Sequence, residues 1–263
     1  MSVALLNGRP ADADGLRALA LVNYGHFSSM QVRDHAVQGI DLHRNRLVMA
    51  TRELFDSGLD FSLVREQMRA AVADEPDCTL RVTVFSRDFD YRNPAAGAAP
   101  DVLVSVSPPS PPRTLPLRVN LFAFERPLPQ VKHVGTFPLF HHRRLAVQAG
   151  FDDALFVGPG GAISEGSVWN VGFWTGAGLV WPEAPALRGT AERLLQAGLE
   201  RQGVGQVVRP VRAEELAGFE GAFACNASGI QPIAGIDGTS FSTTHDGMTR
   251  IRAASALAPW EAL

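Results

Sequence analysis

The chain has 263 residues, of which 46% are hydrophobic and 19% are charged, and its formal net charge is -3. This composition is typical of a packed protein with one large or two ordinary domains, and it disfavours disorder. Without a basic excess, nucleic acid is not expected as a partner. The sequence shows neither a charged leader before a long apolar run nor the roughly 18 apolar residues of a spanning helix, so we expect a cytoplasmic protein without a membrane partner.

The N-terminal part of the chain shows alternating strand and helix signals. Apolar residues 3–6 before the Asn7-Gly8 turn predict a strand and a hairpin. Asp41 is the predicted N-cap of a helix that ends at Ser57-Gly58. The other expected elements are strands at 31–33, 37–40, 80–85 and 102–106 and a helix at about 62–73.

A proline-rich segment divides the chain. Residues 107–116, SPPSPPRTLP, contain prolines that lock φ and favour an extended linker. We therefore predict an N-terminal domain at 1–107, a linker at 108–116 and a C-terminal domain at 117–263.

The C-terminal part again mixes strands and helices. Gly158 to Gly161 lack the sequence context of a phosphate loop and predict a hairpin turn. His141 and His142 have no acidic or cysteine ligands at metal spacing, so we predict no metal site. The other expected elements are strands at 117–124, 168–174 and 179–181, helices at 140–149 and from Thr190 as cap to Gly203 as stop, and a terminal helix after Thr243.

Lys132 is the only lysine among the 24 lysine and arginine residues. An ε-amine can lose its proton and attack a carbonyl to form a Schiff base, whereas a guanidinium stays protonated and cannot. Lys132 is therefore a candidate for specific chemistry. The alternative is a surface lysine without a role.

The spacing around Lys132 resembles that of the fold-type-IV pyridoxal-phosphate enzymes, the class IV family of branched-chain and D-amino-acid aminotransferases and aminodeoxychorismate lyase. The matching positions are Lys132, the segment Gly150 to Leu155, Glu165 and Asn170. The resemblance extends from about Leu6 to Gly238. It implies an α/β (α+β) fold of two domains, with pyridoxal 5'-phosphate in the cleft between them, and a homodimer.

The resemblance also implies which residues bind the cofactor. Lys132 would hold it as an aldimine, and Glu165 would face the pyridine nitrogen. His43-Arg44-Asn45-Arg46-Leu47 matches an H-x-x-R-L motif whose arginine, Arg46, would bind the phosphate. Further phosphate contacts are expected from the segment Gly189, Thr190 and Ala191 at a helix N-terminus and from Asn226. The family has threonine where this chain has Ala191.

Substrate contacts are implied for Tyr24, Arg92, Ala227 and Ser228. Around Tyr24 two alignments are open. If Phe27 matches the family phenylalanine, Ser28-Ser29 resembles the paired threonines of the lyases; without a gap, Met30-Gln31 replaces the family's Glu-Thr. For Tyr24, packing into the core is an equal alternative.

We expect an aminotransferase that moves an amino group between an amino acid or amine and a keto acid. Cleavage of aminodeoxychorismate is one alternative, because the shared apparatus does not specify the substrate groups. The changed Gly189-Thr190-Ala191 segment leaves a non-catalytic relative as another.

Overall fold

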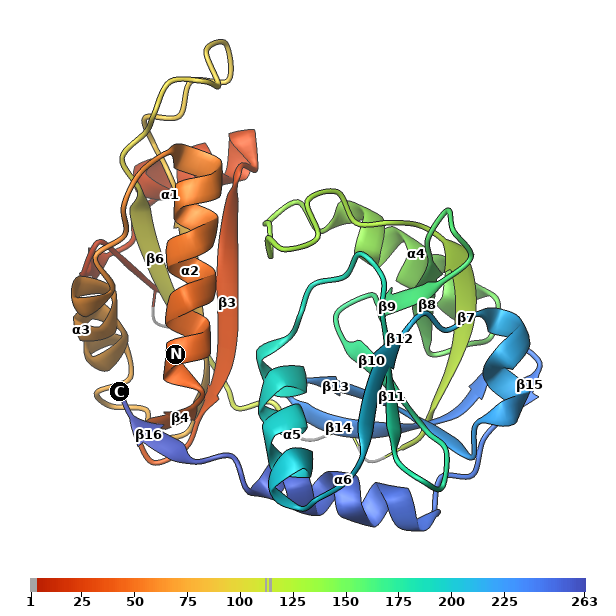
Figure 1. Cartoon of the computed structure of the whole chain (residues 1–263). Helices are drawn as coiled ribbons and strands as arrows, with labels where there is room; N and C mark the ends of the chain where they lie inside the picture. Colours follow the sequence, from red (N-terminus) through yellow and green to blue (C-terminus); the bar gives the residue numbers. More distant parts are fainter. Residues whose placement is uncertain (1–3, 112, 114) are drawn as a thin grey trace. The chain divides into compact units, whose positions relative to one another are not determined.

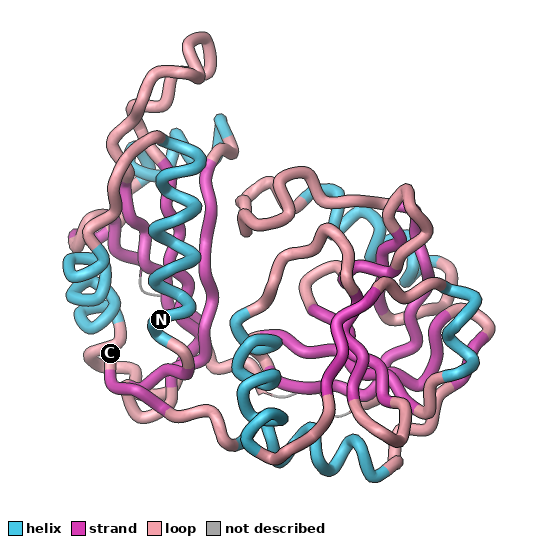
Figure 2. The backbone as a smooth tube through the Cα atoms, viewed as in Figure 1, coloured by secondary structure: helices cyan, strands magenta, loops and turns pink. Residues whose placement is uncertain are grey.

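The computed structural model describes residues 4–111, 113 and 115–263, so residues 112 and 114 of the expected linker lie outside it. The chain divides into two compact units, shown with their helices and strands in Figure 1 and Figure 2. The first unit contains Met1–Ser110, Val131–Gly135 and Pro259–Leu263, and the second contains Pro111–Gln130 and Thr136–Ala258. Two short segments from the C-terminal part of the sequence, one of them carrying Lys132, therefore pack with the first unit.

The first unit is an antiparallel sheet with α2 and α3 on one face and α1 on the other. Its strand order is β2-β1-β6-β5-β3, and Leu47 and Met68 of two helices pack against Leu80 of the sheet. The small pair β4 (Ala36–Gln38) and β16 (Trp260–Ala262) completes it. The sheet consists of β1 (Ala4–Leu6), β2 (Arg9–Pro10), β3 (Gly25–Val32), β5 (Cys78–Phe85) and β6 (Asp101–Ser107), and the helices are α1 (Ala13–Val22), α2 (Ile40–Phe55) and α3 (Phe61–Ala71).

The second unit is built on a mixed, nine-stranded sheet of order β12-β11-β10-β13-β14-β7-β8-β9, with β15 paired to β14. Helices α5 and α6 pack so closely that a Cβ on Gly198 would collide with the carbonyl oxygen of Ala254. The strands are β7 (Leu117–Ala123), β8 (Asp153–Val157), β9 (Ile163–Gly166), β10 (Asn170–Trp174), β11 (Leu179–Pro182), β12 (Gln206–Arg209), β13 (Gly221–Asn226), β14 (Gly229–Ile236) and β15 (Thr239–Ser240); the helices are α4 (Phe137–Gln148), α5 (Thr190–Arg201), η1 (Ala213–Gly218) and α6 (Asp246–Ala256).

Most expected elements are confirmed, including the hairpin turn at 158–161 between β8 and β9 and the terminal helix α6. Helix α1 was not predicted; its N-cap Asp12 accepts a hydrogen bond from the Gly15 amide at 2.7 Å. The prediction that Asp41 caps α2 was wrong, because Gly39, with φ of 68°, is the N-cap and Asp41 lies in the first turn. No helix in the described part of the chain combines the length and the apolar character that a membrane crossing requires.

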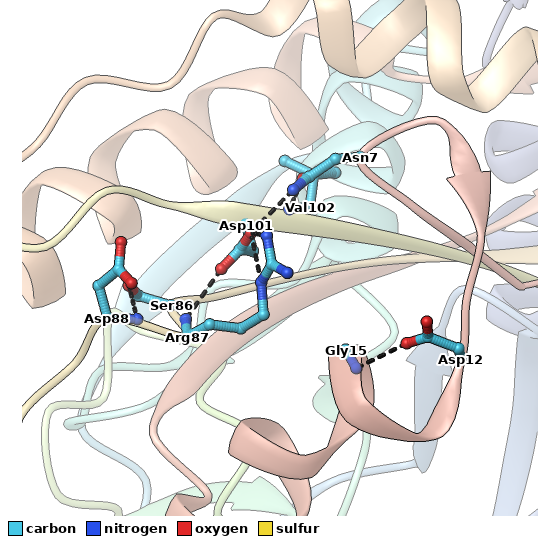
Figure 3. A network of polar contacts seen from close by, with 8 residues as sticks. All are labelled: Asn7, Asp12, Gly15, Ser86, Arg87, Asp88, Asp101 and Val102. Atoms are coloured by element: carbon cyan, nitrogen blue, oxygen red, sulfur yellow. Dashed lines mark hydrogen bonds and ion pairs between the residues drawn. The ribbon is translucent and has the colours of Figure 1, made fainter.

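A polar network in the first unit closes the loop between β5 and β6, which carries Arg92. Figure 3 shows Asn7 and Arg87 converging on Asp101, the first residue of β6. Asp101 accepts hydrogen bonds from Asn7 Nδ2 at 2.8 Å, from the Arg87 amide at 2.8 Å and from Arg87 Nη2 at 2.9 Å. Burial raises the pKa of Asp101, but the hydrogen bonds from Arg87 and Asn7 outweigh it, so the pKa lies below its usual value.

Replacing Asp101 with asparagine should destabilise the protein by about 1 to 3 kcal/mol, because the amide offers a donor where Arg87 and Asn7 both need an acceptor. Urea unfolding at pH 7 measures the change, and Asp88→Asn, at an exposed neighbouring position, is the matched control. A carboxylate with a lowered pKa stabilises the fold above its unfolded-state pKa, and this contribution is lost as the pH falls through the folded-state pKa. The difference between Asp101→Asn and wild type should therefore shrink in acid; an unchanged difference would contradict the assignment.

Candidate active site

In the first unit, Lys132 is placed by backbone pairing with β3. The Phe27 amide donates to the Lys132 carbonyl oxygen at 2.8 Å, and the Val134 amide donates to the Gly25 carbonyl oxygen at 2.9 Å. Residues opposite each other in an antiparallel pair project their side chains to the same face. The Lys132 ammonium accordingly lies 4.9 Å from the centre of the Phe27 ring. The two hydrogen bonds fix the backbone of Lys132, and its side chain places the ε-amine over the Phe27 ring.

Arg81 on β5 lies against the same ring. Its guanidinium carbon is 3.6 Å from the centre of the Phe27 ring, and its Nε donates to Thr83 Oγ1 at 3.2 Å. Among the described residues, no carboxylate lies within ion-pair distance of Arg81. Burial lowers the pKa of Arg81 from its usual high value, yet a guanidinium remains charged at neutral pH. A partly desolvated cation without an acidic partner is suited to bind an anion.

Arg46 on α2 is oriented by a hydroxyl of β3. Its Nη1 donates to Ser28 Oγ at 3.3 Å, and Ser28 Oγ lies 2.7 Å from His43 Nδ1. Burial, with a smaller effect of the Arg46 charge, lowers the pKa of His43 to about 3, so His43 is neutral. Arg46 donates to the same Ser28 oxygen that shares a hydrogen bond with His43 Nδ1. His43 and Arg46 of the H-x-x-R-L motif thus share one hydrogen-bonded chain with Ser28.

The two substrate-contact candidates of the first unit lie apart from this chain. The Tyr24 hydroxyl donates to the Leu54 carbonyl oxygen at 3.1 Å, and its ring stacks on Phe89 with 4.2 Å between ring centres. Tyr24 is thus engaged in packing at the end of α2. Arg92 is exposed on the loop between β5 and β6, with its guanidinium 5.5 Å from the centre of the Tyr91 ring.

In the second unit, Glu165 on β9 is buried in an ion pair with Arg126. Arg126 Nε donates to Glu165 Oε1 at 2.7 Å, and Arg126 Nη2 donates to Oε2 at 3.2 Å. The Leu187 amide adds a donor to Oε1 at 3.3 Å. Both side chains are almost completely buried, at 3% and 4% exposure. A buried carboxylate needs such pairing, and Oε2, which accepts from Arg126 Nη2, keeps a lone pair for a further donor.

The turn after Glu165 is braced from β8. Ser167 Oγ donates to Asp153 Oδ1 at 2.6 Å, and the Ser167 amide donates to the Ala154 carbonyl oxygen at 3.1 Å. Asp153 also lies 3.5 Å from Arg143 Nε of α4. The segment that resembles the family's Gly-x-Asp-x-Ala-Leu strand therefore fixes the backbone that carries Glu165.

The Gly189, Thr190 and Ala191 segment forms the N-terminus of α5, with Gly189 as N-cap. The prediction that Thr190 caps this helix was wrong: the Thr190 hydroxyl has no hydrogen-bond partner among the described residues. Asn170 holds the preceding turn by donating from Nδ2 to the Leu187 carbonyl oxygen at 2.7 Å. A Cβ at position 189 would collide with Asn170 Oδ1, so only glycine fits there.

The remaining candidates form the tight turn between β13 and β14. Asn226 Oδ1 accepts a hydrogen bond from the Ser228 amide at 2.8 Å, and Asn226 Nδ2 donates to the Val168 carbonyl oxygen at 3.3 Å. Ala227 lies between them, at the turn. Asn226 thus shapes the turn and also ties it to the segment that follows Glu165.

The two sets of residues define a two-domain α/β enzyme of fold type IV. Residues 25–236 match the family model described as amino-transferase class IV, and the chain belongs to this family. No curated protein matches the sequence. Membership in this family makes pyridoxal phosphate the cofactor, and the residues present fit it. They include the amine of Lys132, the guanidinium of Arg46 for the phosphate and the buried carboxylate of Glu165. At the N-terminus of α5, the Thr190 hydroxyl has no partner among the described residues.

Solved structures share this fold at low identity. A branched-chain aminotransferase from Thermoproteus uzoniensis is 19% identical with a TM-score of 0.82, covering 97% of this chain and 94% of its own. A hypothetical aminotransferase from Mycobacterium tuberculosis in its PLP-bound form is 21% identical with a TM-score of 0.81, covering 97% and 98%. A putative 4-amino-4-deoxychorismate lyase from Legionella pneumophila is 17% identical with a TM-score of 0.78, covering 89% and 90%.

Sequence reasoning missed Arg81 and Arg126. Arg81 was covered only by the strand predicted at 80–85, and Arg126 was not considered. The sequence did hold a signal for Arg126. It lies next to Pro127 and only a few positions before Lys132, the residue already chosen as the candidate for chemistry. Its pairing with Glu165, however, spans 39 positions and required the tertiary fold.

Truncating Arg126 to alanine should destabilise the protein by about 3 to 5 kcal/mol, because it leaves the Glu165 charge buried and unpaired. The double replacement Arg126→Met with Glu165→Leu should cost much less, since no buried charge remains. Chemical unfolding of both variants measures this difference. Arg144→Ala, at an exposed position of α4, is the control and should change stability by about 0.5 kcal/mol or less. Equal losses in the single and double variants would show that the ion pair is not the cause.

Proposed function

We propose that this protein is a pyridoxal-phosphate-dependent aminotransferase that moves an amino group between an amino acid and a keto acid. One observation carries the proposal: the only lysine is held by backbone hydrogen bonds beside an aromatic ring, and that ring also contacts an arginine with no ion pair to a described carboxylate. When bound, pyridoxal phosphate supplies an electron sink for the carbon that loses its proton. A nucleophilic amine and a cation for a carboxylate are what transamination of an amino acid needs from the protein.

Each residue then has a role that follows from its chemistry. Lys132 would hold the cofactor through Nζ, and its amine would move the proton at the substrate carbon. Arg46 binds the phosphate, and the hydroxyl of Ser28 orients its guanidinium. Glu165 would keep a proton on the ring nitrogen of the bound cofactor, and Arg126 fixes the carboxylate for that role.

Arg81 favours a substrate with a carboxylate. Its guanidinium and the Lys132 ammonium both lie against the Phe27 ring, so an anion bound at Arg81 would lie on the face of the sheet that carries the amine. This supports transfer between amino acids and keto acids over the use of simple amines. The lyase reaction remains the alternative, and assays with both kinds of substrate decide between them.

A homodimer and a cytoplasmic location are part of the proposal. Arg92 stands exposed on a loop that the Asp101 network anchors at both ends, where it is available to a second subunit. Helix α4 exposes the large apolar side chains Phe137 and Phe140, at 75% and 51%. Apolar surface of this kind favours association.

Reduction with borohydride in the presence of pyridoxal phosphate should fix one pyridoxyl group on Lys132, because no other side chain in the protein offers a primary amine. Peptide mass spectrometry locates the group. Lys132→Ala should fold normally and carry no side-chain label. A wild-type protein that stays unlabelled with cofactor supplied would contradict the proposed function and favour the non-catalytic relative.

Arg81→Gln should raise KM for amino-acid and keto-acid substrates by about 10- to 100-fold, the equivalent of one lost charge-assisted contact of about 1.5 to 3 kcal/mol. Steady-state kinetics with an amino acid and with a primary amine lacking a carboxylate separates the effects. The KM for the primary amine should change little. Arg52→Gln, at an exposed position of α2, is the control. Equal losses for both substrates would remove Arg81 from carboxylate recognition.

A further inference from the structure

The N-terminus of α5 already holds an anion of its own, the carboxylate of Glu192. Glu192 lies in the first turn of this 12-residue helix and is only 2% exposed. Its Oε2 accepts a hydrogen bond from the amide of the N-cap, Gly189, at 3.3 Å. Its Oε1 forms an ion pair with Arg188 Nη2 at 2.6 Å. The positive end of the helix dipole and one cap amide, which attract anions, are therefore engaged internally.

The same helix end carries a buried polar group that no described residue satisfies. The hydroxyl of Thr190, a residue that is 7% exposed, has no hydrogen-bond partner in the part of the chain that the structure describes. A buried hydroxyl without a partner costs free energy and is rarely retained without a reason. Thr190 thus points to an external acceptor at the helix end, next to the carboxylate of Glu192.

The charges around Glu192 come from several elements of the second unit. Arg188 and Arg193 lie near it on its own segment, Glu165 of β9 repels it, and the thiol of Cys225 on β13 faces it. Burial is the largest influence and raises the pKa of Glu192 to about 7; Glu165 adds to the rise, while Arg188 and the Gly189 amide oppose it. Arg126 pairs with Glu165, so it does not neutralise Glu192.

We infer that Glu192 is an internal competitor of the cofactor phosphate, so that a dianion binds at the N-terminus of α5 only when the Glu192 carboxylate takes up a proton. The inference rests on the proposed function, because the phosphate would be that of pyridoxal phosphate. A phosphate dianion and a glutamate carboxylate at the same helix end repel each other. The proton comes from solvent and forms the carboxylic acid of Glu192, and no other bond is made or broken.

The direction of the pH dependence follows from this competition. Below a pKa of about 7 Glu192 is largely neutral and the helix end is open to an anion. Above that pKa the neutral fraction falls tenfold for each pH unit, and the apparent dissociation constant rises by the same factor, about tenfold per unit. Anion affinity should therefore weaken in alkaline solution for a reason that lies in the protein and not in the ligand.

Sulfate is the suitable probe, because its charge does not change between pH 5.5 and 9. Its affinity should be measured by titration calorimetry for wild type, Glu192→Gln and Glu200→Gln. Glu200 is exposed on the same helix, two turns further on, so this control removes the same charge and leaves the helix end intact. Wild type and Glu200→Gln should lose about tenfold per pH unit above 7, whereas Glu192→Gln should bind more tightly and show no such slope.

A second measurement needs no variant. Calorimetry of wild type at pH 8 in buffers of different ionisation enthalpy should show uptake of about one proton per bound sulfate. Parallel pH slopes in wild type and Glu192→Gln, or no proton uptake, would overturn the inference, as would absence of sulfate binding in all variants. None of these outcomes touches the labelling of Lys132 by pyridoxal phosphate, so failure of this inference and failure of the proposed function remain distinguishable.

Discussion

The candidate site depends first on two backbone hydrogen bonds, from the Phe27 amide to Lys132 and from the Val134 amide to Gly25. They add a short stretch of chain to the free edge of β3, although the residues on either side of that stretch belong to the other compact unit. Antiparallel pairing sets which face each side chain takes. Because of it, the only ε-amine of the protein lies on the face of β3 that presents Phe27 and Arg81. A lysine on an unpaired loop would have no such fixed neighbours.

The second unit keeps the carboxylates of Asp153, Glu165 and Glu192 buried, and each of them is paired with an arginine. Arg126 binds both oxygens of Glu165, and Arg188 binds one oxygen of Glu192. The planar guanidinium suits this because it presents paired donors at the spacing of carboxylate oxygens and is weakly hydrated. The two glutamates differ in how they are paired, and this difference bears on what each can do. Glu165 is held by a bidentate contact, whereas Glu192 occupies a helix end that an anionic ligand would also need.

The fold alone does not decide which reaction the protein performs, because a branched-chain aminotransferase and a putative aminodeoxychorismate lyase both share it with this chain. The distinction has to come from side chains near the reacting carbon. Arg81 forms no ion pair with a described carboxylate, and it contacts the same aromatic ring as Lys132. On this basis we propose that Arg81 gives the enzyme a preference for substrates with a carboxylate.

The sequence by itself determined the features that depend on neighbours along the chain: the helical and strand periods, the hairpin turn at 158–161, and Lys132 as the one residue capable of amine chemistry. Only the tertiary structure decided the partners of charged and polar groups. Arg126 meets Glu165 across 39 positions, and Lys132 meets Phe27 through pairing of distant segments. Composition and spacing do not show which distant residues come into contact. A charged residue is the same letter in the sequence whether its side chain faces solvent, a carboxylate or a helix N-terminus.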